Sequence, residues 1–160
     1  MPDDLSGPFL VDAMLGKLAT HLRLCGYDAA YALDEHRDTE ADDELLAAAR
    51  EEDRTLLTRD RQLAARAGDR GLCLESRAVT EQLRELRDAG LALELAERPT
   101  RCGACNGPLV RVGEDDVRAA HAPDDRPVWA CERCGQQFWR GSHWNRVAET
   151  LAAIRGENET

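Results

Sequence analysis

Two pairs of cysteines in the second half of the chain have the spacing of metal ligands. Cys102 and Cys105 form one pair, Cys131 and Cys134 form the other, and 25 residues lie between the pairs. Four thiolates satisfy the tetrahedral preference of zinc and leave no open position for a catalytic water. Because we expect no secretory signal in the first residues, metal ligands are favoured over disulfides. We therefore predict a structural zinc site, and the alternative is two reduced pairs without a metal.

Acidic residues at three positions in the first half could hold a different kind of ion. Asp12 and Asp60 each follow an apolar stretch, and Asp42 or Asp43 opens a helical pattern. Carboxylates suit hard ions such as Mg2+ and Mn2+, which clamp phosphate oxygens and can ionise a water for attack on a phosphodiester. The alternative is that each aspartate only caps a helix, a position that aspartate favours. Spacing alone leaves both interpretations open.

The first hundred residues alternate between short apolar stretches and helical patterns, and this order determines where the acids lie. The predicted strands span residues 9–11, 28–33, 54–58 and 71–75. The predicted helices run from Met14 to a stop at Gly26, from Asp42 or Asp43 through Leu45 and Ala49, and over residues 61–67 and 79–90. The polar segment 34–43 is predicted to be a loop, with the helix starting at its end.

This alternation predicts an α/β fold in which a parallel sheet is covered by helices on both faces. In such sheets, ligands bind beyond the carboxyl ends of the strands. Asp12 and Asp60 each follow a predicted strand, and Asp42 lies at the start of the helix before the third strand. We therefore expect three acids that are distant in sequence to converge on one rim of the sheet.

A change in composition near Pro99 predicts a boundary between two units. After it, cysteines, glycines, tryptophans and short apolar pieces replace the strand and helix alternation. We predict a first domain over residues 1–98, a small zinc ribbon with a C-terminal helix over 99–154, and a tail over 155–160. A unit as short as the second, with few core residues, needs a metal to hold it together.

Two basic residues lie close to the predicted acidic rim. Lys17 follows Asp12 by five residues and is the only lysine of the chain, and Arg59 directly precedes Asp60. Lys17 could stabilise charge on a scissile phosphate, or it could be an ordinary exposed helix residue. Arg59 could face phosphate or solvent. We keep Lys17 as a candidate catalytic residue and Arg59 as a candidate nucleic-acid contact.

The segment FWRGSHWNR, residues 138–146, mixes aromatic and basic side chains. Such a mixture can stack on bases and hold phosphates, which makes Arg140, His143 and Trp144 candidate RNA contacts. The alternative is structural: the aromatic residues pack the ribbon against the first domain, and Ser142 caps the last helix. The near-helical spacing of apolar residues after Ser142 supports the structural alternative.

Composition limits the possible classes of protein. The chain has 160 residues and a formal net charge of -10, and no apolar run approaches the ~20 residues of a membrane span. We expect a soluble cytoplasmic protein. Residues 1–100 hold 22 acidic and 13 basic side chains, whereas residues 101–160 hold 9 and 8. Phosphate therefore meets less repulsion from the second part of the chain.

Several segments together resemble one protein family. FLVDAMLGKLATHLRLCGYD, ADDELLAAAREEDRTLLTRDRQLA, RCGACNGPL and CGQQFWRGSHW occur in the order found in the Mut-seven-C RNase domain family. The resemblance covers about residues 8–147. It implies a PIN-like nuclease domain with an appended zinc ribbon, and metal-dependent ribonuclease activity.

The resemblance also assigns roles to individual residues. It implies that Asp12, Asp42 and Asp60 hold Mg2+ or Mn2+, with Asp43 not excluded as the second acid, and that the four paired cysteines bind zinc. PIN-like nucleases often carry a fourth acid, for which Glu75 is the natural position, although no motif marks it. With three acids the site could hold one ion rather than two.

We therefore predict a metal-dependent endoribonuclease whose partner is an RNA substrate and whose zinc is structural. The alternative is a catalytically silent module that binds RNA or protein on a PIN-like fold. The presence of acids at all three positions favours the nuclease.

Overall fold

The computed structural model describes residues 5–34 and 41–157, and its first unit is built on a four-stranded sheet. The strands are β1 (Phe9–Val11), β2 (Ala29–Tyr31), β3 (Thr55–Thr58) and β4 (Gly71–Cys73). They are all parallel and lie in the order β2-β1-β3-β4. The predicted parallel sheet is confirmed.

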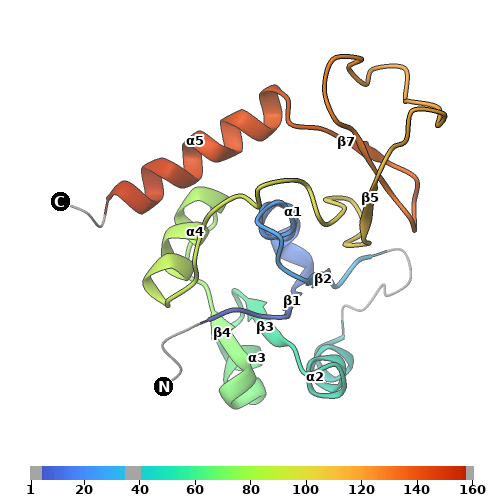
Figure 1. The fold of residues 1–160 in the computed structure, drawn as a ribbon. Coiled ribbons are helices and arrows are strands. Elements are labelled where there is room, and N and C mark those ends of the chain that lie inside the picture. The colour runs from blue at the N-terminus through green and yellow to red at the C-terminus, as the bar shows by residue number, and fades with distance from the viewer. Residues whose placement is uncertain (1–4, 35–40, 158–160) are drawn as a thin grey trace.

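Helices cover both faces of this sheet, as predicted (Figure 1). On one face lie α1 (Gly16–Leu24), α4 (Val79–Asp88) and α5 (Ser142–Gly156), and on the other lie α2 (Asp42–Glu51) and α3 (Arg61–Ala67). Short 3-10 turns, η1 (Ala13–Leu15) and η2 (Gly68–Arg70), follow β1 and α3. Successive side chains of a strand point to opposite faces, so each strand contributes to both cores. Phe9 and Val11 pack beneath α1, whereas Leu10 packs toward α2 and α3.

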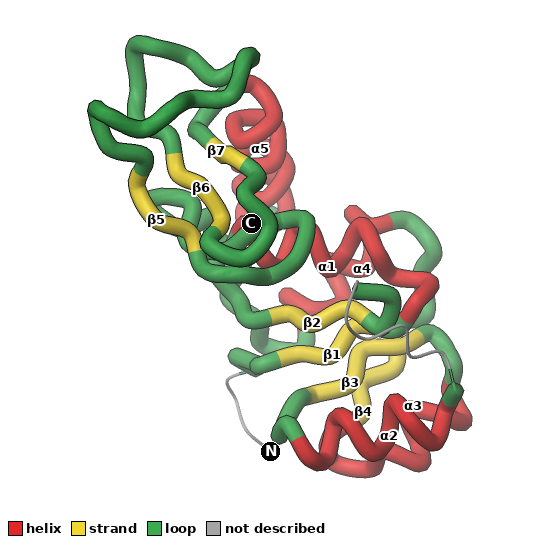
Figure 2. The backbone as a smooth tube through the Cα atoms, turned by 90° about the vertical axis from the view of Figure 1, so that its right-hand side faces the viewer, coloured by secondary structure: helices red, strands yellow, loops and turns green. Residues whose placement is uncertain are grey.

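The predicted ribbon forms a second, antiparallel sheet. Its strands are β5 (Leu109–Arg111), β6 (Trp129–Cys131) and β7 (Gln137–Phe138), in the order β5-β6-β7. Figure 2 shows this sheet standing apart from the parallel one, with long loops at its outer end. The chain leaves the ribbon through residues 139–141 and enters α5.

The last helix packs against the core of the first unit. Trp144, Val147, Leu151 and Ile154 of α5 belong to the same buried cluster as Phe9, Leu18 and Leu83. Helix α5 also lies beside α4 (Figure 1). The chain therefore returns to the first unit after the ribbon, while the domain boundary at residue 98 stays a prediction.

Several predicted element ends differ from the structure by one or two residues; β4, for example, ends at Cys73 and α4 at Asp88, where residues 75 and 90 were predicted. The strand predicted over residues 28–33 ends at Tyr31, because the carboxylate and the N–H of Asp34 bond the N–H and the C=O of Tyr31 and close a turn. The last helix continues to Gly156, beyond its predicted end at Ile154. Ser142 is the first helical residue rather than the cap, because Gly141 holds the cap position and no side chain bonds there.

Residues 35–40 of the predicted loop lie outside the described residues. None of the helices in the described part of the chain is long and apolar enough to cross a membrane.

Candidate active site and metal centre

Asp12 lies at the carboxyl end of β1, one of the two central strands, and is held by two hydrogen bonds. Its Oδ1 accepts from the N–H of Ala13 at 2.7 Å, and its Oδ2 accepts from the hydroxyl of Thr58 at 2.6 Å. The first bond caps the 3-10 turn η1. Asp12 is only 6% exposed, and Thr58 is fully buried. The carboxylate is therefore both a cap and a fixed group at the rim of the sheet.

Asp60 lies just beyond β3 and caps α3. Its Oδ1 accepts from the N–H groups of Gln62 and Leu63, at 3.0 and 3.1 Å. Its own N–H donates to the hydroxyl oxygen of Thr58 at 3.0 Å. Thr58 therefore connects Asp12 and Asp60, because its hydroxyl donates to the first and accepts from the second.

The two aspartates flank a topological switch point. β1 and β3 are neighbours in the sheet, and Val11 pairs with Leu57. The chain leaves β1 toward α1 on one face and leaves β3 toward α3 on the other face. In open parallel sheets, divergence of this kind opens a crevice beyond the carboxyl ends of the strands, where ligands bind. The predicted convergence of Asp12 and Asp60 on one rim is consistent with this geometry.

Asp42 is placed differently from the other two acids. It is the exposed first residue of α2, and the cap position before it is held by Ala41. Its neighbour Asp43 forms an ion pair with Arg66 of α3, with a nitrogen–oxygen distance of 2.5 Å. Within residues 5–34 and 41–157, no three carboxylates have oxygens that all lie within 4.8 Å of one another. The structure thus links Asp12 with Asp60 and does not bring Asp42 into that contact.

The other candidate residues near the rim lie after β1, β3 and β4. Arg59 donates from Nη2 to the carbonyl of Glu75 at 3.4 Å, and its Nε is buried without an acceptor among the described residues. The Glu75 carboxylate is largely exposed and pairs with Arg61 at 3.0 Å. Lys17 is exposed in the first turn of α1. These positions leave Lys17 and Arg59 available to a bound phosphate, whereas Glu75 is engaged by Arg61.

The four paired cysteines come together as a candidate metal centre. Their sulfurs all lie within 4.8 Å of one another, with Cys102 and Cys134 at 3.6 Å and Cys105 and Cys131 at 3.5 Å. A tetrahedron of thiolates about 2.3 Å from zinc has sulfur separations of about 3.8 Å. The donor set and the distances therefore fit zinc, and neither pair is at the length of a disulfide.

Local hydrogen bonds prepare one of these thiols for metal binding. The backbone N–H groups of Arg133 and Cys134 point at the sulfur of Cys131, at 3.3 and 3.4 Å. Burial raises the pKa of Cys131, but these bonds and the neighbouring thiols outweigh it and lower the pKa to about 7. At Cys102 burial dominates and raises the pKa of the thiol. A bound cation would offset that cost, because thiolates are the ligating form.

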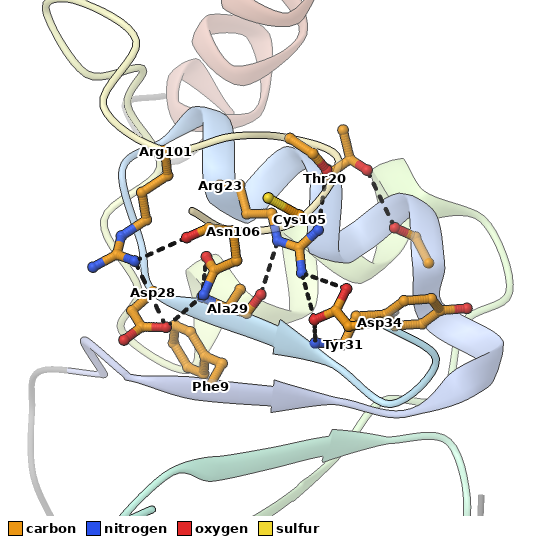
Figure 3. A network of polar contacts seen from close by, with 12 residues as sticks. Phe9, Thr20, Arg23, Asp28, Ala29, Tyr31, Asp34, Arg101, Cys105 and Asn106 are labelled. Carbon is orange, nitrogen blue, oxygen red and sulfur yellow. Dashed lines mark hydrogen bonds and ion pairs between the residues drawn. The ribbon is translucent and has the colours of Figure 1, made fainter. Parts of the chain in front are cut away.

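The first cysteine pair is joined to the edge of the parallel sheet by the side chain of Asn106 (Figure 3). Its Oδ1 accepts from the N–H of Ala29 in the edge strand β2 at 3.1 Å, and its Nδ2 donates to Asp28 at 2.7 Å. Asp28 also accepts from Arg54 at 2.7 Å. Burial raises the pKa of Asp28, but the bonds from Arg54 and Asn106 prevail and leave it below its ordinary value.

A buried arginine makes the second connection between the two units (Figure 3). Arg23 of α1 is 2% exposed and donates to the carbonyls of Ala29 and Gly103, at 2.8 and 3.0 Å. Its Nη2 bonds both carboxylate oxygens of Asp34. The loop that carries Cys102 and Cys105 is therefore attached to the edge of β2 at Ala29, directly through Asn106 and indirectly through Arg23.

The candidate RNA contacts in the segment 138–146 have different surroundings. Trp144 is 9% exposed and packs in the core with α5, which favours the structural alternative for this residue. His143 is exposed in the first turn of α5. Arg140 is also exposed and donates to the carbonyl of Glu97 at 3.3 Å. Arg140 and His143 remain accessible to a ligand.

Sequence reasoning missed Thr58, Asn106 and Arg23. Thr58 ends a predicted strand, and its role depends on the register between β1 and β3, which short apolar stretches do not specify. Asn106 has a weak signal, because an asparagine after the second cysteine of a pair suits the left-handed backbone found there, with φ 69°. Arg23 looks like an exposed helix residue in the sequence, and only the folded ribbon gives it partners.

Comparison with known proteins agrees with these features. No curated protein and no solved structure matches the chain. The profile of the Mut7-C RNAse domain family matches residues 8–151, which include the four parallel strands, the rim aspartates and the four zinc-site cysteines. Since this match extends over nearly the whole sequence, the chain belongs to the Mut7-C RNAse domain family.

Proposed function

We propose that the protein is a metal-dependent endoribonuclease that hydrolyses RNA phosphodiester bonds on a PIN-like fold. Membership of an RNase domain family supports a nuclease-like function in RNA metabolism. The observation that carries the proposal is the placement of Asp12 and Asp60 on either side of a switch point, tied together through Thr58. Folds of this class bind their ligands beyond the carboxyl ends of the parallel strands, which is where these two carboxylates lie.

Asp12 and Asp60 would hold Mg2+ or Mn2+, and Asp42, the first residue of α2, is the candidate third acid. The donor set fits, because Mg2+ is usually bound through one or two carboxylates, with waters and substrate phosphates completing the shell. When bound, the ion lowers the pKa of a water and offsets negative charge on the phosphate. Thr58 orients the carboxylate of Asp12, and this fixed geometry reduces reorganisation during the reaction.

Two basic side chains would bind the phosphate of the substrate. The buried Nε of Arg59 has no acceptor among the described residues, and an orphaned donor of this kind favours a ligand that supplies an oxygen. Lys17, exposed one turn after Asp12, can add positive charge at the same rim. The zinc of the four cysteines would be structural, because four thiolates leave no position for a reacting water.

A cleavage assay with conservative variants tests the proposal. Purified zinc-loaded protein is incubated with single-stranded and with structured RNA, with Mn2+ added or omitted, and without chelators that would strip the zinc. Asp12→Asn and Asp60→Asn should each lower the rate by about 10²-fold or more, the usual cost of losing one essential electrostatic group. Asparagine caps helices as well as aspartate does, so both variants should fold.

Asp43→Asn is the matched control for Asp42→Asn. The first removes an acid that is paired with Arg66, and the second removes its exposed neighbour. A large loss in Asp42→Asn with a small one in Asp43→Asn would support the assignment of Asp42. Cleavage that persists in both Asp12→Asn and Asp60→Asn would overturn the site. If the unmodified protein cleaves neither kind of RNA, the silent binding module is favoured.

A further inference from the structure

Among the described residues, most arginines whose side chains form hydrogen bonds are paired with carboxylates. Arg23 pairs with Asp34, Arg54 with Asp28, and Arg84 with Glu157. In such a pair the carboxylate neutralises the charge of the guanidinium, so these arginines attract an anionic ligand only weakly. Arginines without such partners are therefore the ones that indicate where an anion could bind.

Three arginines without carboxylate partners line one cavity beside the zinc ribbon. The cavity has a volume of about 540 Å³ and is lined by Arg98, Arg111 and Arg140, which come from the linker, from β5 and from the loop before α5. All three are exposed, and none makes an ion pair within the part of the chain that the structure describes. The guanidinium of Arg140 donates to a carbonyl, that of Glu97, and not to a carboxylate among the described residues. Since Glu97 is the only acid in the lining, the cavity carries an excess of positive charge.

An aromatic pocket adjoins this cavity. Its volume is about 290 Å³, and its walls include Phe138, Trp139 and the exposed His143. Pro99 lines both spaces, so the two are neighbours. Trp139 is half-buried, unlike Trp129 and Trp144, and so presents part of its ring to the pocket. An apolar aromatic pocket beside an arginine-lined cavity suits a nucleotide better than it suits a free anion, because bases stack on aromatic rings while guanidinium groups hold phosphates.

We propose that this ribbon surface, formed by Arg98, Arg111, Arg140 and the Trp139 pocket, is a binding site for single-stranded RNA, separate from the acidic rim. The arginines bind backbone phosphates, and the Trp139 pocket receives an unpaired base. Paired bases would be unavailable to the pocket, so the site takes single strands. Neither space is lined by Asp12 or Asp60, so the site holds RNA without touching the reacting bond. As a substrate-holding site, it depends on the proposed nuclease function.

Binding can be measured without cleavage by fluorescence anisotropy, with a labelled single-stranded RNA of mixed sequence. The protein is zinc-loaded, carries Asp12→Asn and is kept free of Mg2+ and Mn2+. The triple variant Arg98→Gln, Arg111→Gln, Arg140→Gln should bind about 10- to 100-fold more weakly, from a few-fold loss for each exposed charge. The slope of log affinity against log salt should become shallower by about 2, because each single-strand phosphate that a cation neutralises contributes about 0.7 to that slope.

Matched variants separate this site from general charge. Arg50→Gln in α2, at the other end of the molecule from the ribbon (Figure 1), removes one exposed charge and should leave binding unchanged, whereas Arg111→Gln should weaken it. The triple arginine-to-lysine variant keeps the charge and should recover most of the affinity. Circular dichroism and zinc content show whether each variant is folded.

Two further ligands test what the site recognises. An RNA with abasic positions keeps every phosphate but offers no base, and it should bind at least about 5-fold more weakly than the intact strand, as the absence of one stacked base implies. Polyglutamate should not compete. Equal binding of the abasic strand, competition by polyglutamate, or unchanged affinity in the triple glutamine variant would each overturn the proposal.

Failure of this inference differs from failure of the proposed nuclease. RNA that binds through the arginines but is not cut by the protein with Asp12 intact and Mn2+ present would contradict the nuclease alone. RNA that is cut while the triple variant binds as tightly as the parent would contradict the ribbon site alone.

Discussion

Asn106 offers the sharpest test of how the ribbon is attached to the first unit. Its side chain joins the zinc-site loop to the edge strand β2, through the N–H of Ala29 and the carboxylate of Asp28. Asn106→Gly removes both bonds and creates no steric conflict, because glycine accepts the left-handed backbone at this position, where φ is 69°. The variant therefore isolates the side-chain hydrogen bonds from backbone strain.

The expected loss of stability follows from the burial of the partners. Ala29 is fully buried, so its N–H would lose its acceptor without access to water, at a cost of about 1–3 kcal/mol. The bond to Asp28 adds about 0.5–1.5 kcal/mol, kept low because Asp28 is partly exposed and retains Arg54. The free energy of unfolding should fall by roughly 2–4 kcal/mol, which lowers the melting temperature by about 5–15 °C in a chain of this size.

Urea unfolding of zinc-loaded protein, followed by circular dichroism, measures this change. Zinc content is determined for each variant, so that loss of the metal is not mistaken for loss of the two hydrogen bonds. Asn106→Asp keeps an acceptor for Ala29 but removes the donor to Asp28 and adds a second carboxylate beside it, so it should also be destabilised. Asn145→Ala, an exposed position in α5, should stay within about 0.5 kcal/mol of the parent. If Asn106→Gly unfolds within the same margin, the attachment does not depend on this side chain.

Three further results are expected. Thr58→Val removes the hydroxyl between the rim aspartates, so the cleavage rate should fall by more than about tenfold. Thr58→Ser keeps the hydroxyl and should keep the cleavage rate, and equal rates in the two variants would contradict the role of the hydroxyl. Removal of zinc should accelerate hydrogen exchange at the N–H of Ala29, because its acceptor lies in the zinc-site loop, and mass spectrometry at β2 with and without added zinc measures this. Bonds from Arg84 and Arg87 lower the pKa of Glu157 to about 2, so this carboxylate stabilises the fold above about pH 4.5 and the benefit is lost as the pH falls toward 2. The difference in unfolding free energy between the parent protein and Glu157→Gln should therefore shrink across that range, and a constant difference would argue against the pairing.

The sequence was sufficient to predict the parallel sheet because its signals are local. Short apolar stretches such as Phe9–Val11 and Thr55–Thr58 are separated by helical patterns, and this alternation permits few topologies. The cysteine cluster was predictable for a similar reason, since the spacing within each cysteine pair marks candidate metal ligands. The positions of Asp12 and Asp60 at strand ends were predictable from the sequence. The register that links them through Thr58 was not, because strands of three or four residues carry little pairing information.

Hydrogen bonds between the two units were not predictable from the sequence. Asn106 and Arg23 are polar residues in stretches that look like a surface loop and an exposed helix face. Their partners lie up to 80 residues away in the chain, as in the bond from Arg23 to Gly103. No periodicity or motif within one segment reports a bond of that kind. The zinc-site loop thus covers the edge of β2, which would otherwise present unpaired backbone groups.

The position of α5 determines how the two units depend on each other. Val147, Leu151 and Ile154 are at most 5% exposed and, with Trp144, complete the cluster beneath α1 and α4. Burial of four side chains of this size contributes about 1.5–3 kcal/mol each, and the sum is comparable to the whole stability of a typical domain. The ribbon is therefore held at both ends, by the linker before it and by a helix that belongs to the core of the first unit. Asn106 and Arg23 bind its inner side as well, which fixes the orientation of the ribbon to the sheet, as the proposed RNA-binding surface requires.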